Sequence, residues 1–369
     1  MGEEPIRILY VNGGLMNRGG IESFMMNYYR RFDRLLVQID FVVHGYGVGA
    51  YDEEIKALGG NIYHVPIKSK HPFRYPRELK KIIKAGEYKI IHSHADAMSC
   101  WILKIAAECG VPVRIAHSHN TKHYTTNPVK YFINERARKN ITKYATHCFA
   151  CSEAAGKWLF GEHRFTVVPN AFELDKFAFD EKLRMQLRTQ YRLSENDYVI
   201  GHVGRFAPQK NHAFLLDMFR AFSRENAAAK LVLIGDGELR KNIEDKIAAY
   251  ELTDEVLLLG ACDNVAELYN MMDVFVLPSE FEGLPVSALE AQANGMPCVC
   301  SEHVPSETAV TADSITFLPD DIGAWKQALH ALQRKGRVDR LAALKAMGYD
   351  VEAESKKLQN FYLTAQTKK

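Results

Sequence analysis

Short apolar runs alternate with amphipathic segments throughout the first half of the chain. Segments with helical periodicity separate the runs, as at residues 21–32, 76–86 and 98–110, and Gly110 is placed to end the last of them. Strands that are apolar along their whole length need cover on both faces, which is the property of parallel sheets. The pattern therefore predicts a parallel sheet between two layers of helices. Its strands are expected at residues 6–12, 37–44, 61–67, 88–95, 111–119, 146–152 and 165–170.

The alternation is interrupted once and then resumes. Residues 170–197 are polar and hold no strand-like run, after which six apolar runs follow, again with helical segments between them. The sequence therefore predicts an α/β protein of two Rossmann-like, doubly wound domains facing a cleft, residues 1–178 and 179–349. A final helix is expected at about 350–369, and its place is not fixed by periodicity. The six runs are residues 198–205, 229–237, 255–261, 273–279, 297–302 and 314–319.

Composition and charge narrow the class of protein. The chain has 369 residues, of which 47% are hydrophobic, enough for two domains with their own cores. A net charge of +2 argues against a dedicated nucleic-acid binder. Residues 1–178 hold 25 Lys and Arg against 17 Asp and Glu, whereas residues 179–369 hold 22 against 28. This asymmetry indicates either a first domain that faces an anionic partner or a chance distribution of solvated charge.

The cysteines point to a reducing compartment. There are seven, and the sequence shows neither a signal-peptide pattern nor an apolar run of the ~18 residues that cross a bilayer. We therefore expect a cytosolic protein with reduced thiols. Cys148 and Cys151 form a C-x-x-C pair inside an apolar run, with no second pair at zinc spacing. Buried thiols are expected there rather than a metal or redox site.

A glycine-rich loop, NGGLMNRGG, follows the first expected strand. Gly14 and Gly19 fit the P-loop pattern, but Gly20 and Ile21 occupy the positions of its Lys and Ser or Thr. The dinucleotide pattern G-x-G-x-x-G also fails, because the gap between the glycine pairs is too long. The loop therefore suits close approach of the backbone to a ligand, though not in an ATPase or a dehydrogenase.

Two cations follow the first strand of the second half. Arg205 comes at the end of that strand, and Lys210 lies just before an apolar helix that Asn211 could cap. A guanidinium and an ammonium group beside a helix N-terminus can clamp a diphosphate. After the next strand, Gly235 and Gly237 permit a tight turn, which an ordinary connection would also need.

The stretch EFEGLPVSALEAQANG carries the most information. Pro285 suits the first turn of a helix and Gly295 its C-terminal end, so the N–H groups of Gly283 and Leu284 are expected at the helix N-terminus. Two acids, Glu282 and Glu290, would lie about a dozen ångströms apart along the axis. That separation is too long for the carboxylate pair of a glycoside hydrolase, which needs ~5–10 Å. It suits two contacts along one extended ligand, although Glu282 could also act as a simple helix cap.

Histidines end two strands of the first domain. His92 and His94 share one face of their strand, and His117 and His119 share a face of the next. Each pair could bind a metal, but no Asp or Cys completes a ligand set at suggestive spacing. We expect one histidine of the second pair to face the cleft as a hydrogen-bond partner, and the others to cap strand ends.

These motifs together resemble those of the retaining, nucleotide-sugar-dependent glycosyltransferases of family 4 (group 1), which have the GT-B fold. The resemblance rests on GRFAPQKN, on PSEFEGLPVSALEA with its two glutamates, on VVPNAFE at the domain junction, and on the Gly-Gly loop. It covers nearly the whole chain. The phrase RIAHSHN is similar to that of enzymes that build capsular or exopolysaccharide repeat units on membrane-bound, lipid-linked saccharides.

The resemblance implies that the donor lies mainly in the C-terminal domain. Arg205 and Lys210 would hold the diphosphate, Glu290 the ribose hydroxyls, and Glu282 a hydroxyl of the transferred sugar. Leu284 and Pro285 follow the loop glycine directly, where many relatives have another glycine and an aromatic residue, so the identity of the sugar is open. The donor-binding set is completed by Gly235, Gly283 and Leu284.

For the N-terminal domain, the resemblance implies an acceptor side. The Gly19–Gly20 loop would lie near the phosphate and the acceptor, and His119 matches the histidine that approaches the donor sugar, with His117 a rival one alternation away. The catalytic set is then His119, Glu282, Arg205 and Lys210. Neither a cofactor nor a divalent metal is expected, and the C-terminal helix is expected to cross back onto the first domain.

The expected function is metal-independent, retaining transfer of a hexose from a UDP-sugar to a saccharide acceptor, lipid-linked, in capsule or exopolysaccharide synthesis. A sugar-nucleotide epimerase with the GT-B fold is one alternative, since it would use the same nucleotide clamp. A non-catalytic nucleotide-sugar-binding subunit is the other, although it would be expected to lack one of the clamp groups. No nucleic-acid partner is expected.

Peripheral contact with a membrane is a further expectation for the first domain. Residues 122–144 hold six Lys and Arg against one acidic residue, together with several aromatic residues, and residues 73–84 are also basic. Such segments can rest on anionic lipid, or they can be an ordinary solvated surface. The expected location is the cytoplasm, with the inner face of the cytoplasmic membrane as the place of contact.

Overall fold

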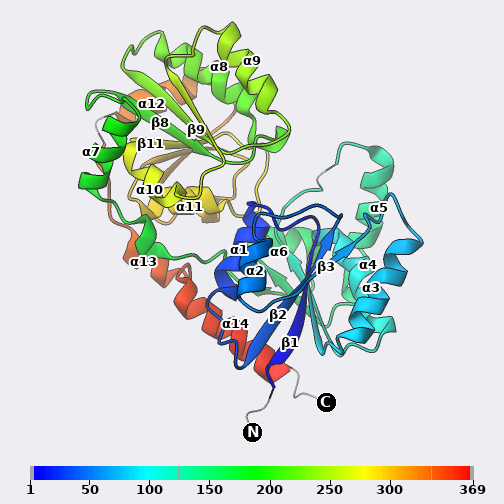
Figure 1. Ribbon diagram of the computed structural model, residues 1–369. Coiled ribbons are helices and arrows are strands. Elements are labelled where there is room, and N and C mark those ends of the chain that lie inside the picture. The colour runs from blue at the N-terminus through cyan, green and yellow to red at the C-terminus, as the bar shows by residue number, and fades with distance from the viewer. Residues whose placement is uncertain (1–3, 124, 334, 366–369) are drawn as a thin grey trace. The chain divides into compact units, whose positions relative to one another are not determined.

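The chain forms two compact units. The structure, a computed structural model, describes residues 4–123, 125–333 and 335–365. Unit 1 comprises Met1–Phe172 together with Gly348–Lys369, and unit 2 comprises Glu173–Met347 (Figure 1). The first division falls after Phe172, where the sequence suggested residue 178, and the second after Met347, where it suggested residue 349.

Unit 1 contains one seven-stranded parallel sheet, in the order β3-β2-β1-β4-β5-β6-β7. Every strand expected in this part of the chain is present; β1, β2, β4 and β5 are largely buried, as a sheet covered on both faces requires, whereas the short edge strand β7 is exposed. The strands are β1 (Ile6–Asn12), β2 (Val37–His44), β3 (Ile62–Val65), β4 (Ile90–His94), β5 (Val113–Ser118), β6 (His147–Ala150) and β7 (Thr166–Val167).

Helices separate these strands and pack on the sheet. Gly110 has a φ of +78°, the left-handed conformation expected just after a helix end. The α-helices of unit 1 are α1 (Gly20–Tyr29), α2 (Asp52–Ala57), α3 (Arg74–Ala85), α4 (Ser99–Glu108), α5 (Pro128–Arg138), α6 (Glu153–Phe160) and α14 (Val351–Ala365), with 3₁₀ turns η1 (Asp96–Met98) and η2 (Ile141–Lys143).

The last helix, α14, belongs to the core of unit 1. Its residues Val351, Leu358 and Tyr362 are buried with side chains of β1, β2 and α1. The chain enters and leaves unit 2 at neighbouring points of unit 1, since the N–H of Phe172 donates to the carbonyl of Tyr349 at 3.1 Å. Figure 1 shows this helix in red beside the blue N-terminal strands.

Unit 2 contains a six-stranded parallel sheet, in the order β10-β9-β8-β11-β12-β13. All six strands expected in this part of the chain are present, and the side chains of β8, β9 and β11 share a core with α8 and α12. The strands are β8 (Tyr198–Val203), β9 (Ala229–Ile234), β10 (Val256–Gly260), β11 (Val274–Leu277), β12 (Cys298–Ser301) and β13 (Ile315–Leu318).

The polar stretch before β8 becomes a helix tied to the sheet by charge. Arg184 and Arg188 of α7 each contact Asp273, at 2.6 Å, just before β11. The helices of unit 2 are α7 (Glu181–Gln190), α8 (His212–Ser223), α9 (Arg240–Ala249), α10 (Val265–Leu268), α11 (Val286–Ala293), α12 (Ile322–Leu332) and α13 (Leu341–Ala346), with 3₁₀ turns η3 (Leu174–Phe177), η4 (Pro208–Lys210), η5 (Tyr269–Met271) and η6 (Ser306–Thr308).

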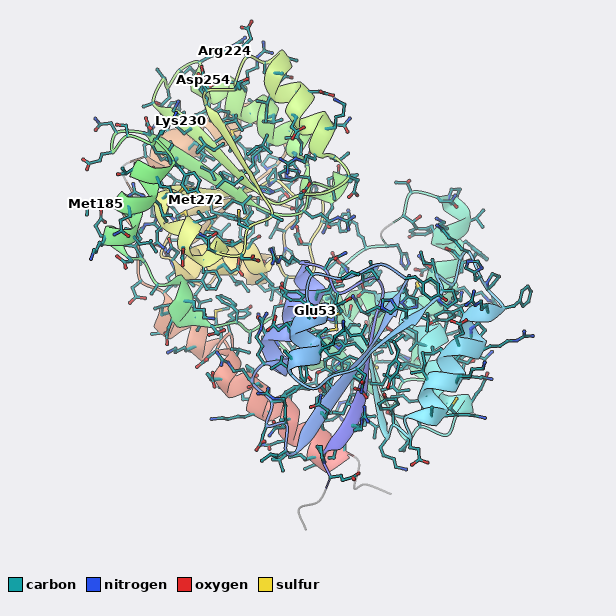
Figure 2. The ribbon with its side chains drawn as sticks, in the orientation of Figure 1. Glu53, Met185, Arg224, Lys230, Asp254 and Met272 are labelled. Atoms are coloured by element: carbon teal, nitrogen blue, oxygen red, sulfur yellow. The ribbon has the colours of Figure 1, made fainter. Side chains whose placement is uncertain are left out.

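Each sheet reverses its strand order once, between β1 and β4 in unit 1 and between β8 and β11 in unit 2. In open α/β sheets, ligands bind beyond the carboxyl ends of the strands at such a reversal. The loops there follow β1, β4, β8 and β11. In unit 2, Arg224, Lys230 and Asp254 lie at the opposite, amino-terminal edge of the sheet (Figure 2). Within the described residues, no helix is long and apolar enough to cross a membrane.

Candidate active site

The loops after β8 and β9 in unit 2 are held together by close backbone contacts. Gly235 has a φ of +142°, and a Cβ there would lie 2.0 Å from the carbonyl oxygen of Gly204. A Cβ on Gly237 would lie 2.5 Å from the carbonyl oxygen of Phe206. Only glycine permits this approach, so the loop after β9 packs directly on the loop after β8. The structure thus gives Gly235 a packing role, while its contact with a donor stays a prediction.

Lys210 and Glu282 form an ion pair across the reversal. Lys210 ends η4, after β8, and its Nζ lies 2.7 Å from Oε1 of Glu282 in the loop after β11. Both side chains are largely buried, at 14% and 9% exposed. Gln209 joins the two loops as well, since its Nε2 donates to the carbonyl of Phe281 at 2.8 Å. The sequence predicted that Lys210 and Glu282 each contact a ligand, and the structure shows their side chains in direct contact with each other.

Asn211 ends the same loop and caps α8, as the sequence indicated. It adopts the left-handed conformation, with a φ of 51°, and its side chain accepts a hydrogen bond from the N–H of Phe214. The cap fixes where α8 begins, directly after Lys210.

Arg205 lies in the same loop but is exposed. It pairs with Glu238 at 2.8 Å, and both side chains are at least half exposed. Exposed pairs of this kind contribute ~0–1 kcal/mol, because water screens the charges. The guanidinium group can therefore exchange Glu238 for an anionic ligand at little cost.

The start of α11 differs from the prediction. The helix begins at Val286, and Pro285 is its N-cap with extended backbone (φ −74°, ψ 109°) rather than a residue of the first turn. Gly283 and Leu284 therefore precede the cap, so their N–H groups are not those of the helix N-terminus. The cause is the proline, which disfavours helical backbone at the residue before it. The other end is as predicted, since Gly295 follows the C-cap with a φ of +78°.

Glu290 lies in the middle of α11 and is bound by Tyr269. The hydroxyl of Tyr269 donates to Oε2 of Glu290 at 2.9 Å and contacts the carbonyl of Ser287 at 3.0 Å. Burial raises the pKa of Glu290 to about 7, and the Tyr269 hydrogen bond opposes this rise. The sequence analysis missed Tyr269 because η5 precedes β11 rather than following a strand end.

The sequence analysis also missed a pair of buried histidines close to Lys210. His202 and His212 are buried with their rings 4.8 Å apart and nearly perpendicular, and His202 bonds the carbonyl of Val276. Burial lowers the pKa of His212 to about 4 and that of His202 well below its usual value. Both imidazoles are thus neutral at physiological pH. The apolar strand pattern around His202 gave no signal of this pair.

In unit 1, the glycine loop leads from β1 into α1. Gly19 is the N-cap and Gly20 the first residue of the helix. A Cβ on Gly19 would meet Oε2 of Glu22 at 2.3 Å, whereas one on Gly20 would meet nothing within 4 Å. Asn12 bonds Glu22 at 2.8 Å and so ties the end of β1 to the first turn. The Glu22 carboxylate is the end of a flexible side chain and could move aside, and Gly19 has an ordinary extended backbone, so the structure does not require glycine at either position.

The four histidines of β4 and β5 form a stacked, hydrogen-bonded ladder. His92 Nε2 lies 3.0 Å from His117 Nδ1, and His94 Nδ1 lies 3.0 Å from His119 Nε2. Stacking joins the two rungs, with ring centroids 4.1 Å apart on β4 and 4.2 Å apart on β5. The expectation that the histidines outside the cleft cap strand ends is therefore wrong, because the shared strand faces bring the rings to one another.

His119 differs from His117 in its surroundings. His117 is wholly buried, whereas His119 is 7% exposed. The backbone N–H of His119 donates to Asp96 at 2.7 Å. Burial lowers the pKa of His119 to about 3 and that of His117 well below its usual value. Both rings are therefore neutral. Of the two, only His119 has a surface that a ligand could reach.

Three of these rings, His92, His94 and His117, also have nitrogen atoms within 4.8 Å of one another, close enough for a shared cation. A metal would have to displace the hydrogen bond between His92 and His117 and separate rings that stack. The absence of a metal from the expected reaction stays a prediction.

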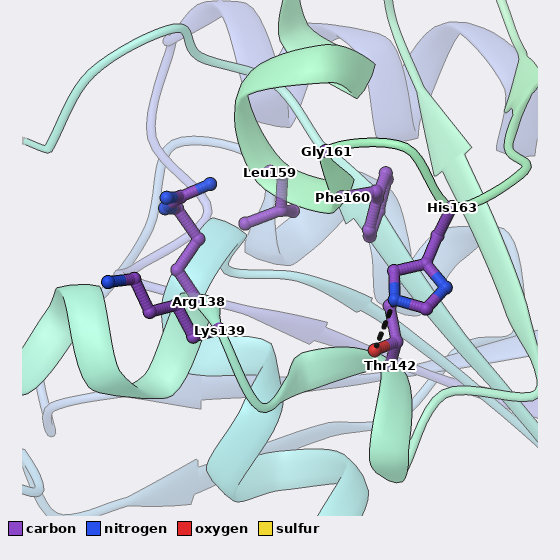
Figure 3. A pocket seen from close by; sticks show the side chains of 7 residues that line it. All are labelled: Arg138, Lys139, Thr142, Leu159, Phe160, Gly161 and His163. Atoms are coloured by element: carbon purple, nitrogen blue, oxygen red, sulfur yellow. Dashed lines mark hydrogen bonds between the residues drawn. The ribbon is translucent and has the colours of Figure 1, made fainter.

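Two other features lie away from these residues. A surface hollow in unit 1 is lined by the ends of α5 and α6 and by η2, where Thr142 and His163 share a hydrogen bond of 3.4 Å (Figure 3). None of its lining residues is a predicted site residue. All seven cysteines are free thiols, and burial raises the pKa of Cys148 to about 11, so its thiol is unreactive at neutral pH.

Comparison with known proteins identifies both halves of the chain. The family model described as glycosyl transferases group 1 matches residues 184–335, and the model described as glycosyltransferase family 4 matches residues 18–176. A putative glycosyltransferase of Bacillus subtilis, EpsF, is 36% identical over 375 residues, covering 98% of this chain and 97% of the relative.

A second relative and a solved structure extend the likeness. The Escherichia coli UDP-Gal:alpha-D-GlcNAc-diphosphoundecaprenol alpha-1,3-galactosyltransferase is 30% identical over 233 residues, 60% of each chain. The crystal structure of Anabaena HepE in complex with UDP and glucose superposes with a TM-score of 0.79 at 16% identity, covering 97% of this chain and 100% of that one. These likenesses and the two parallel-sheet units agree: the chain belongs to the group 1, family 4 glycosyltransferases and has the GT-B fold.

Proposed function

We propose that this glycosyltransferase moves a hexose, with retention of configuration, from a UDP-sugar to a lipid-linked saccharide during capsule or exopolysaccharide synthesis. The observation that carries the proposal is the buried Lys210–Glu282 ion pair at the strand reversal of unit 2, with the exposed Arg205 in the same loop after β8. The solved relative in complex with UDP and glucose supports the donor class. The E. coli relative, whose name specifies a diphosphoundecaprenol-linked acceptor, supports the acceptor class.

The chemistry follows from where charge develops. As the bond between the anomeric carbon and the diphosphate breaks, negative charge grows on the phosphate oxygens. Fixed cations bind that charge more strongly in the transition state than in the ground state. Lys210 is held close to the sugar-binding carboxylate of Glu282, so one ion pair would orient both the phosphate and the sugar. In the proposed reaction the departing phosphate takes the acceptor's proton on the same face, and no divalent ion takes part.

Two further residues complete the proposed donor site. Glu290 would accept hydrogen bonds from the ribose hydroxyls, with Tyr269 fixing its orientation. His119 of unit 1 would contact the donor sugar through the ring nitrogen that is not bonded to His94. Its lowered pKa makes it a neutral hydrogen-bond partner rather than an acid.

Calorimetric titration with UDP tests the proposal. Replacing Arg205→Ala is expected to weaken UDP binding ~10- to 100-fold, since a hydrogen bond to a charged group is worth ~1.5–3 kcal/mol. Arg224→Ala is the matched control, because Arg224 is also exposed but lies at the opposite edge of the same sheet (Figure 2). Equal affinity in wild type and the Arg205 variant would count against the proposal.

Incubation with donor alone separates transfer from the epimerase alternative. A transferase is expected to leave the sugar unchanged or to hydrolyse it slowly to UDP and sugar. An epimerised sugar nucleotide, detected by chromatography, would favour the epimerase instead.

A further inference from the structure

Three segments of unit 1 stand exposed at one edge of its sheet. Residues 46–48 follow β2, residues 69–74 follow β3, and residues 126–133 follow β5 and begin α5. Every residue in these three segments is exposed. Because all seven strands are parallel, segments that follow the strands emerge at the same, carboxyl edge. Gly19 and His119 follow β1 and β5 and lie at this edge too.

Large apolar side chains are concentrated in these segments. Val48 is 82% exposed, Phe73 81%, Phe132 67% and Val129 66%. On α5, Val129, Phe132 and Ile133 are spaced i, i+3 and i+4, so they share one face of the helix. We call these side chains, together with Ile67 just before the second segment, the apolar edge of unit 1; its members are Tyr46, Val48, Ile67, Phe73, Val129, Tyr131, Phe132 and Ile133.

The first half of α5 is anchored by its N-cap and by the second half of the helix, and its apolar side chains are exposed to solvent. Asn127 caps the helix by accepting from the N–H groups of Val129 and Lys130. At the other end Ala137 is buried, and Arg138 bonds Glu135. The helix is thus anchored by its second half. Exposing Val129, Phe132 and Ile133 on its first half costs solvation free energy, whereas Tyr131 contacts the ring of His123 at a centroid distance of 5.1 Å.

The charge around the apolar edge is mainly positive, although Glu78 at its border pairs with Arg74 and accepts a hydrogen bond from Tyr46. Residues 45–51, 66–77 and 119–134 hold six Lys and Arg and no Asp or Glu. An exposed helix face with aromatic and aliphatic side chains, set among cations, is typical of surfaces that lie in the interface of an anionic bilayer. The six cations are Lys68, Lys70, Arg74, Arg77, Lys122 and Lys130.

We propose that the apolar edge docks on an anionic lipid bilayer, with Phe73 and the Val129–Ile133 face of α5 entering the headgroup region and the six cations contacting lipid phosphates. The proposal rests on the proposed function in one respect: a lipid-linked acceptor would then be presented at the sheet edge that carries Gly19 and His119. Two separate insertion points, one before α3 and one on α5, fix the orientation of unit 1 on the membrane.

Vesicle flotation of the full chain tests the docking surface. Wild type is expected to float with phosphatidylcholine vesicles that contain phosphatidylglycerol, and to float less at high salt, because the cations act at a distance that ions screen. The double variant Phe73→Asp/Phe132→Asp is expected to bind ~10-fold more weakly or worse. Leu35→Asp is the control: Leu35 is 80% exposed but lies just before β2, at the opposite edge of the sheet.

The outcomes separate this surface from the alternatives. Flotation of the double variant at wild-type level, or no flotation of wild type, overturns the proposal. Light scattering without lipid is the second measurement, and a wild-type oligomer that the double variant loses would assign the apolar edge to contact between copies instead. UDP affinity is expected to be unchanged in every variant. If wild type floats but does not bind UDP, the proposed function fails while the docking surface stands.

Discussion

At the scale of single residues, the two ion pairs in the site of unit 2 differ in how far their side chains are buried. The Lys210–Glu282 pair is largely withdrawn from water, so removing either partner would leave an uncompensated charge. The Arg205–Glu238 pair is exposed and weak, which leaves Arg205 available to a ligand. One cation of the proposed clamp is thus fixed in place and the other can move.

The proposed contact of Glu290 with the ribose would give donor binding a pH dependence. Burial raises the pKa of Glu290 to about 7, so the side chain loses its proton as pH rises from 6 to 8, and only the carboxylate would accept from both ribose hydroxyls. UDP affinity is therefore expected to rise over this range in wild type more steeply than in Glu290→Gln. Titration of UDP at pH 6, 7 and 8 checks this, since ionisation of UDP itself affects both proteins alike.

The raised pKa of Glu290 also makes the stability of the folded protein depend on pH. Between pH 4.5 and 7 the folded protein binds more protons at Glu290 than the unfolded chain does, so this residue's contribution to stability falls as pH rises. Glu195→Gln, which removes an exposed acid of unit 2, is the control for both measurements and is expected to follow wild type. Identical pH profiles for wild type and Glu290→Gln would contradict the assignment.

The candidate site residues could be named from the sequence, but the contacts that these residues make could not. The spacing of Glu282 and Glu290 and the position of Lys210 were legible in the sequence. That Lys210 contacts Glu282, that Tyr269 holds Glu290 and that His94 bonds His119 could not be read there. These contacts join loops far apart in the chain, and they depend on the register of strands that periodicity alone does not supply.

At the scale of elements, α14 is tied to the sheet of unit 1 by a polar contact inside its core. The hydroxyl of Tyr362 lies 2.7 Å from the hydroxyl of Tyr10 on β1 and 2.7 Å from Nδ1 of His92 on β4. The histidine ladder therefore continues into α14. The strands were predictable because their apolar runs are mostly buried, with β7 the exposed exception. Periodicity did not place α14, because an amphipathic pattern shows that a helix has a buried face but not what covers it. Its return to the first domain was expected from the family resemblance alone.

Tyr362→Phe is expected to destabilise unit 1 by ~1–3 kcal/mol, because Tyr10 and His92 would lose a partner in a buried place. Hydrogen–deuterium exchange checks this by segment: amides of β1 and β4 should exchange faster, while those of β8 and β9 in unit 2 should not change. Tyr131→Phe, on the exposed half of α5, is the control and should leave all four segments unchanged. Unchanged exchange in the Tyr362 variant would show that its hydroxyl is dispensable.

At the scale of the whole molecule, two sheets of the same design carry different charges and different side chains at their strand reversals. Unit 1 offers a glycine loop, neutral histidines and a basic, apolar edge, whereas unit 2 offers a cation pair and two carboxylates. The division of roles between an acceptor side and a donor side, which the sequence suggested, would follow from these differences rather than from the fold, which the two units share.

Removing divalent metal ions with a chelator tests whether the proposed reaction needs a metal. We expect EDTA treatment followed by dialysis to leave both turnover and UDP affinity unchanged, because Arg205 and Lys210 supply the positive charge that a divalent ion would otherwise bring. Loss of either property, restored by Mg²⁺ or Mn²⁺, would contradict the expectation. Zn²⁺ added to the chelated protein is a further probe of the His92, His94 and His117 group.

The return of α14 to unit 1 also bears on the order in which the chain can acquire its structure during translation. Unit 2 is one uninterrupted segment, so all of its residues have been made before the last helix. Unit 1 begins first, yet its hydrophobic interior lacks Val351, Leu358 and Tyr362 until that helix has been made. The unit that is begun first is thus completed last, and a chain truncated before residue 351 would contain every residue of unit 2 but an incomplete core in unit 1.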